Sequence, residues 1–191
     1  MAVPNAEEAR RILAARRLPA GVVTHSEGVA RVASEAARML GVAGIPVDVG
    51  LVEAAALLHD IDKLETRGGR GVHGVAGAAM LEVMGFAELA PPVASHPVSA
   101  LLDDARFPRG WPSVAVSVAD KHVAQEFLTV DERLNDMARR YPRFRSEINA
   151  ARRPAHALES ELADAVGLPV ADLVAALRRA WESRVGERSG R

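Results

Sequence analysis

Residues 54–63, AAALLHDIDK, constrain this chain more than any other stretch, because an apolar run delivers an adjacent histidine and aspartate into the interior. The small and aliphatic residues before the pair predict a helix that is buried on all sides. An imidazole and a carboxylate at the end of such a helix must be paired, hydrogen-bonded or metal-bound, since an uncompensated buried charge is costly. His59 and Asp60 therefore predict partners elsewhere in the chain, and a bound ion readily explains their placement.

The composition favours packed helices around this pair. Apolar residues make up 49% of the 191 residues but aromatic residues only 4%, which suits closely packed helices better than a sheet or a surface that stacks on bases. The length fits one domain with a sizeable core. We therefore expect an all-α fold, a compact helical bundle, formed by residues 1–191 as a single domain.

Charge and cysteine usage exclude several classes of partner. The chain has 24 basic and 25 acidic side chains, so no net field favours DNA, RNA or an anionic membrane. It has no cysteine, which leaves nitrogen and oxygen atoms as the only metal ligands. Residues 1–17 lack an apolar signal core, and no apolar run is long enough to span a bilayer. We expect a cytoplasmic protein without a membrane or nucleic-acid partner.

Capping residues and helical periodicity predict the elements. Asn5 with Glu8 and Thr24 with Glu27 have the spacing of helix caps, and Pro112 suits the first turn of a helix. Helices are expected over residues 6–17, 24–40, 49–61, 73–85, 98–102, 112–127, 131–141, 144–166 and 170–185. Between the third and fourth of these, residues 64–71 predict a flexible glycine-rich loop.

Six side chains near the ends or apolar faces of these segments are candidate metal ligands, and they are His25, His59, Asp60, His73, His96 and Asp120. Their order, the motif His-Asp-Ile-Asp-Lys and the later Val118-Ala119-Asp120 resemble the HD-domain superfamily of metal-dependent phosphohydrolases. The resemblance spans about residues 20–125, and residues 131–188 are expected to pack on that core. His122 and His156 are not expected to be ligands.

The resemblance implies how these six residues would divide between two ions. In its two-metal branches the first ion would be held by His25, His59, Asp60 and Asp120, and the second by Asp60 as a bridge with His73 and His96. Such nitrogen and oxygen ligands suit manganese, iron, cobalt, nickel or zinc, with one or two ions bound. Two ions about 3.5–4 Å apart can activate water and clamp the attacking and leaving oxygens of a phosphate ester.

Cationic side chains near the motif are candidates for substrate contact. Lys63, three residues after Asp60, is expected to join it in catalysis by neutralising charge on a phosphate oxygen. Arg67 and Arg70 could bind phosphate from the glycine-rich loop, or could simply be solvated. Asp62 stands where glycine is often found in related sequences, and we interpret it as a helix-end acid, with orientation of Lys63 as the alternative.

These features predict a metal-dependent phosphohydrolase acting on a small phosphorylated compound. A nucleotide-like ester or anhydride is expected, and symmetrical hydrolysis of a dinucleoside tetraphosphate is one candidate. A di-iron oxygenase is the alternative, because such enzymes of this superfamily use the same ligand order. A non-catalytic, metal-binding helical signalling module is a further alternative. The sequence does not indicate an oligomeric state.

Overall fold

The computed structural model describes residues 3–183. In this range the regular secondary structure is helical, with an isolated β-bridge between Val123 and Phe127. The α-helices are α1 (Ala6–Ala15), α2 (Ala20–Val42), α3 (Val49–Leu58), α4 (Lys63–Arg67), α5 (Val75–Val83), α6 (Ala90–Ser95), α7 (Trp111–Asp120), α8 (Val130–Arg140), α9 (Arg145–Ala150), α10 (Arg152–Ala165) and α11 (Val170–Glu182). The 3-10 helices are η1 (Ala87–Leu89), η2 (Val98–Leu102) and η3 (Pro142–Phe144). The expected all-α fold is confirmed.

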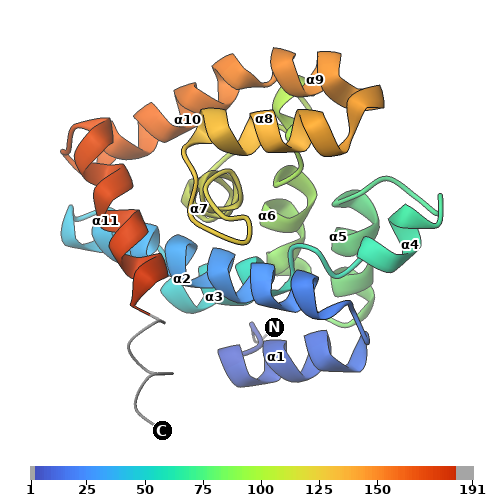
Figure 1. The fold of residues 1–191 in the computed structure, drawn as a ribbon. Coiled ribbons are helices and arrows are strands. Elements are labelled where there is room, and N and C mark those ends of the chain that lie inside the picture. The colour runs from blue at the N-terminus through green and yellow to red at the C-terminus, as the bar shows by residue number, and fades with distance from the viewer. Residues whose placement is uncertain (1–2, 184–191) are drawn as a thin grey trace, which may run out of the picture.

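Helices α3 and α7 are the most deeply buried elements. The side chains of α3 from Ala54 to Leu58 are inaccessible to solvent, and every residue of α7 from Ser113 to Asp120 is buried. The long helix α2 packs against both of them, while α6 contacts α3 and α7 as well. Figure 1 shows α8, α9 and α10 over one side of this centre and α1 on the opposite side. The carboxyl ends of α3, α6 and α7 are thus held within one packed core.

The later helices contribute to the same continuous hydrophobic core. Leu134 of α8, Leu162 of α10 and Leu177 of α11 are buried in it together with residues of α1 to α3. Helix α11 packs on α2, and α10 packs on α7. Residues 184–188, which the sequence assigned to this C-terminal part, lie outside the described residues. The division into domains stays a prediction.

Several helix starts follow from local capping chemistry. The Asn5 side chain accepts a hydrogen bond from the backbone N–H of Glu8 at 2.9 Å, as its spacing predicts. Asp48 caps α3 in the same way, and Thr129 and Glu132 form a reciprocal capping box at the start of α8. The predicted cap at Thr24 is wrong, because α2 already begins at Ala20.

Other predicted boundaries also shift. The predicted helix over residues 49–61 ends at Leu58, so the His-Asp pair lies in the turn that follows α3. The predicted loop over residues 64–71 begins with the short helix α4. The predicted helix over residues 144–166 is divided at Ala151 into α9 and α10. Residue 185, the predicted end of the last helix, lies outside the described residues.

Candidate metal centre

The six predicted ligands converge from five segments of the chain. His25 lies in α2, His59 and Asp60 follow α3, and His73 precedes α5. His96 is the residue after α6, and Asp120 is the last residue of α7. Because the partial negative charge of a helix lies at its carboxyl end, the ends of α3, α6 and α7 favour a cation between them.

One half of the cluster is formed by His25, His59 and Asp120. The Nε2 atom of His25 lies 3.1 Å from Nε2 of His59 and 3.1 Å from Oδ1 of Asp120. Nε2 of His59 lies 3.9 Å from the same carboxylate oxygen. These three ligand atoms are close enough together to hold one metal ion.

The other half surrounds the Asp60 carboxylate. Its Oδ1 atom lies 3.2 Å from Nε2 of His73, 3.6 Å from Nε2 of His96 and 3.7 Å from Nε2 of His59. Asp60, His59 and His96 also have the spacing of a metal site. The sequence pattern gave Asp60 as the shared residue, whereas His59 belongs to both of these triads.

Hydrogen bonds on the far side of the rings determine which nitrogen faces the centre. Nδ1 of His59 donates to the carbonyl of Ala56, and Nδ1 of His96 donates to the carbonyl of Val93, both at 2.7 Å. A carbonyl oxygen can only accept, so each Nδ1 carries the proton and each Nε2 presents a lone pair. This is the tautomer that a metal-ligating histidine needs.

His73 is held in the same tautomer by a carboxylate. Its Nδ1 lies 2.8 Å from Oδ1 of Asp62, while its Nε2 faces Nε2 of His96 at 3.2 Å. Two unprotonated nitrogens at this separation repel each other unless a cation or a proton lies between them. The donor set therefore fits a divalent ion by its own chemistry.

The pKa values of His59 and His96 are lowered, which keeps these rings neutral, whereas the pKa of His73 is raised. Burial lowers the pKa of His59 to about 3, although neighbouring Asp60 opposes the shift. Burial also lowers the pKa of His96. Burial opposes protonation of His73 too, but hydrogen bonds to Asp60 and Asp62 outweigh it and raise the pKa of this ring.

Both buried ligand carboxylates are held in the ionised form. Burial disfavours the Asp60 carboxylate, but His59 and Lys63 outweigh this effect and hold its pKa well below the usual value. Burial likewise opposes ionisation of Asp120, and the adjacent Lys121 is the main group that keeps its pKa well below the usual value. Two anionic ligands thus remain available to a cation at neutral pH.

The predicted cationic residues occupy different places. Nζ of Lys63 donates to Oδ1 of Asp60 at 2.8 Å and lies 3.1 Å from Nε2 of His73, while its side chain is 23% exposed. Lys63 is therefore both at the centre and open to solvent. Arg67 ends α4 and Arg70 lies in the loop after it, and both are exposed. Their contact with a substrate stays a prediction.

Three residues at the centre were missed or misread from the sequence. Asp62, interpreted as a helix-end acid, is fully buried and faces His73. Lys121, a buried lysine, contacts the Asp120 carboxylate. Arg133 of α8 places Nη2 3.7 Å from Oδ1 of Asp120, from outside the predicted core of residues 20–125. The adjacency of Lys121 to Asp120 was the one available sequence signal.

His122 and His156, which lie outside the cluster, have other partners. Nδ1 of His122 donates to the carbonyl of Leu128 at 2.7 Å, and its Nε2 lies 2.9 Å from Oε1 of the buried Glu159. His156 lies 3.1 Å from Asp131. His122 therefore links the end of α7 to α10 rather than to the ligand cluster.

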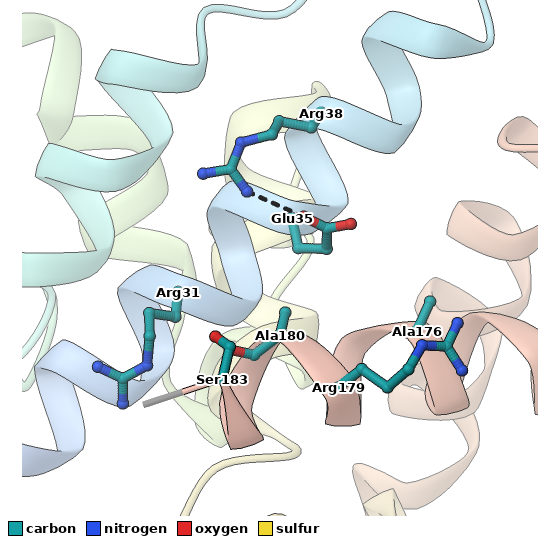
Figure 2. Close-up of a pocket in the computed structure, with 7 residues that line it drawn as sticks. All are labelled: Arg31, Glu35, Arg38, Ala176, Arg179, Ala180 and Ser183. Carbon is teal, nitrogen blue, oxygen red and sulfur yellow. Dashed lines mark hydrogen bonds and ion pairs between the residues drawn. The ribbon is translucent and has the colours of Figure 1, made fainter. Parts of the chain in front are cut away.

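A surface pocket lies elsewhere on the molecule, between α2 and α11. Figure 2 shows its charged lining, in which Arg38 donates to Glu35 at 2.9 Å, with Arg31 and Arg179 nearby. None of the six predicted ligands lines it.

Among the described residues, no helix combines the length and apolar character needed to cross a bilayer.

Comparison with known proteins agrees with the geometry. A family model described as "HD domain" matches residues 22–122, more than half of the chain. The uncharacterized protein MJ0778 of Methanocaldococcus jannaschii is 39% identical over 79 residues, which cover 41% of this chain and 46% of that relative. The match therefore spans less than half of the relative's length. No solved structure matches the chain.

Proposed function

The chain belongs to the HD-domain family, a superfamily of metal-dependent hydrolases, and on that basis we propose that it is a phosphohydrolase whose centre is formed by the six clustered side chains. We propose a nucleotide-like ester or anhydride as its substrate, with symmetrical hydrolysis of a dinucleoside tetraphosphate as one candidate. The supporting observation is the 3.2 Å approach of the His73 and His96 Nε2 atoms, both of which present lone pairs. A divalent cation between the two rings would accept both lone pairs and relieve their repulsion.

The residues would hold one or two divalent ions. His25, His59 and Asp120 would bind on one side, and Asp60, His73 and His96 on the other, with His59 able to serve either. When bound, such ions supply Lewis acidity and lower the pKa of water at neutral pH. Manganese, iron, cobalt, nickel and zinc all suit these ligands.

The protein's own residues would bind and orient the phosphate. Lys63 carries its ammonium group beside Asp60 and remains partly open to solvent, so it can contact a non-bridging phosphate oxygen. Arg67 and Arg70 lie on the exposed segment that follows and could reach a longer polyphosphate. The buried walls from α3 and α7 exclude bulk water from the centre and strengthen these electrostatic contacts.

A substrate panel tests the reaction class. Nucleoside mono-, di- and triphosphates, dinucleoside polyphosphates and phosphodiesters are incubated with protein loaded with manganese, cobalt, nickel or iron, with and without dioxygen. Phosphate or nucleotide release that continues without dioxygen supports the proposal. A product that forms only with iron and with consumption of dioxygen would instead identify the oxygenase alternative.

The variant Asp60→Ala distinguishes the centre from contaminating activity. Oδ1 of Asp60 lies within 3.7 Å of Nε2 of three imidazoles and accepts from Lys63, so removal of this carboxylate should abolish both metal retention and hydrolysis. The matched control Asp104→Ala removes an exposed carboxylate and should leave both unchanged. Full hydrolysis by Asp60→Ala would refute the assignment of the centre.

A further inference from the structure

Asp62 is joined to the N-terminal end of α5 by three hydrogen bonds. Oδ1 accepts from Nδ1 of His73 at 2.8 Å, and Oδ2 accepts from the backbone N–H groups of Gly74 at 2.8 Å and Gly77 at 3.1 Å. The side chain is inaccessible to solvent. Although Asp62 precedes α4, its carboxylate does not cap that helix.

The backbone that receives Asp62 is shaped by two glycines. A Cβ atom at Gly74 would lie 2.8 Å from Cγ of Pro97, and the φ angle of +82° there is one that other residues rarely adopt. A Cβ atom at Gly77 would lie 3.1 Å from Cγ1 of Val93 and 3.4 Å from Cγ of Asp62. The segment from residue 73 to 77 therefore approaches Asp62 more closely than larger residues would allow.

His73 differs from the other buried imidazoles in its partner. His59 and His96 donate from Nδ1 to neutral backbone carbonyls, whereas His73 donates to a carboxylate. A carboxylate fixes the ring orientation and makes the opposite nitrogen a stronger electron donor to a metal. His73 also lies on a loop segment before α5. Its ring is therefore not oriented by the backbone of a helix.

We propose that Asp62 is a positioning residue that holds His73 in its metal-binding tautomer and thereby determines the affinity of the ion held by Asp60, His73 and His96. This inference rests on the proposed metal centre and goes beyond it. Asp62 would not touch substrate or ion, because its two oxygens face the ring and the backbone of α5. The expected role is selective, since His25 and Asp120 have no contact with it.

The variant Asp62→Asn tests the proposal with a minimal change. Asparagine retains an oxygen that can accept from Gly74 and Gly77 but places an amide N–H group toward Nδ1 of His73. That nitrogen would then have to accept, which moves the ring proton to Nε2 and blocks the metal-binding atom. Mn²⁺ is titrated into the full-length protein, and free Mn²⁺ is measured by electron paramagnetic resonance.

We expect two Mn²⁺ ions in the wild type and, in Asp62→Asn, a loss of affinity of about 10–100-fold for one ion with the other unchanged. The control Asp48→Asn makes the same substitution at an exposed cap, where the carboxylate accepts only from the backbone N–H of Leu51. It should bind both ions as the wild type does. A variant Asp62→Asn that folds and binds both ions with unchanged affinity would overturn the proposal.

A measurement on the metal-free wild type covers the case in which Asp62→Asn does not fold. Long-range ¹⁵N–¹H nuclear magnetic resonance at alkaline pH reports which nitrogen of His73 carries the proton, with His73→Gln assigning the signal. We expect protonated Nδ1 and unprotonated Nε2. A predominant Nε2–H tautomer would reject the positioning role. These readouts do not depend on turnover, so failure to hydrolyse any phosphate would reject the proposed function alone.

Discussion

Replacement of Lys121 by methionine should destabilise the metal-free protein strongly. Its Nζ atom donates to the carbonyl of His96 at 2.7 Å and to Oδ2 of Asp120 at 2.9 Å, and the side chain is only 2% exposed. Lys121 therefore connects the end of α6 to the end of α7. Burial lowers the pKa of this lysine, while Asp120 opposes that shift.

The size of the effect follows from the charge that the substitution leaves behind. Methionine has nearly the same length, so the cavity contribution is small. The main cost is that the buried Asp120 carboxylate loses its nearest cation and keeps only Arg133 at 3.7 Å. Removing one partner of a buried ion pair costs about 3–5 kcal/mol. Small domains are stable by only about 5–15 kcal/mol, so Lys121→Met should lose a large fraction of the folding free energy.

Urea denaturation in the presence of a chelator measures this cost. The chelator ensures that no bound metal ion neutralises the Asp120 carboxylate in the variant. The control Arg139→Met removes a cation from an ion pair with Asp136 whose arginine side chain is 77% exposed, and it should cost less than about 1 kcal/mol. If the free energy of unfolding of Lys121→Met also stays within about 1 kcal/mol of the wild type, the buried pair does not stabilise the fold and our reasoning fails.

Two further predictions concern pH and turnover. The metal-free protein should lose stability as the pH falls from about 6.5 to 3, because unfolded His59 gains a proton in this window while the folded ring stays neutral. Urea denaturation at several pH values in this range measures the free energy of unfolding, and its slope against pH should be shallower in His59→Gln. An unchanged slope would contradict the assignment. His73 acts in the opposite direction, since its raised pKa adds stability that disappears as the pH rises through that value. Lys63→Ala should retain its metal but lower kcat, because the ammonium group is placed to stabilise phosphate charge; metal analysis beside steady-state kinetics checks this, and metal loss would reassign Lys63 to a structural role.

The sequence was informative where local chemistry decided the outcome. The apolar run before His59 predicted a buried helix, and residues such as Asn5 marked a helix start that the structure confirms. The all-α class followed from composition and periodicity, and family membership followed from the order of the candidate ligands. Those ligands lie close together because the helices that carry them pack against one another. The spacing of the ligands in the sequence suggests this packing but does not determine it.

The partners behind the ligands could not be read in this way. Asp62 faces the start of α5 because residues 64–72 bring that helix back beside the turn after α3. The path of this segment depends on tertiary packing and not on local sequence. Arg133 reaches Asp120 from α8, across a connecting loop, and also donates to the backbone carbonyl of Asp120. Helix α2 begins before Thr24 because Val22 is buried there and Glu27 pairs with Arg10 instead of closing a capping box.

The placement of the ligands at helix ends links metal binding to the topology of the chain. Residues from α2 through α7 meet at one point, so an ion held there would cross-link segments that are far apart in the sequence and would close long loops of the chain. Closing long loops lowers the conformational entropy of the unfolded state most, in the way that a disulfide does in proteins that contain cysteine. This chain has no cysteine, and its imidazoles and carboxylates would supply a reversible equivalent, one that a chelator rather than a reductant could open.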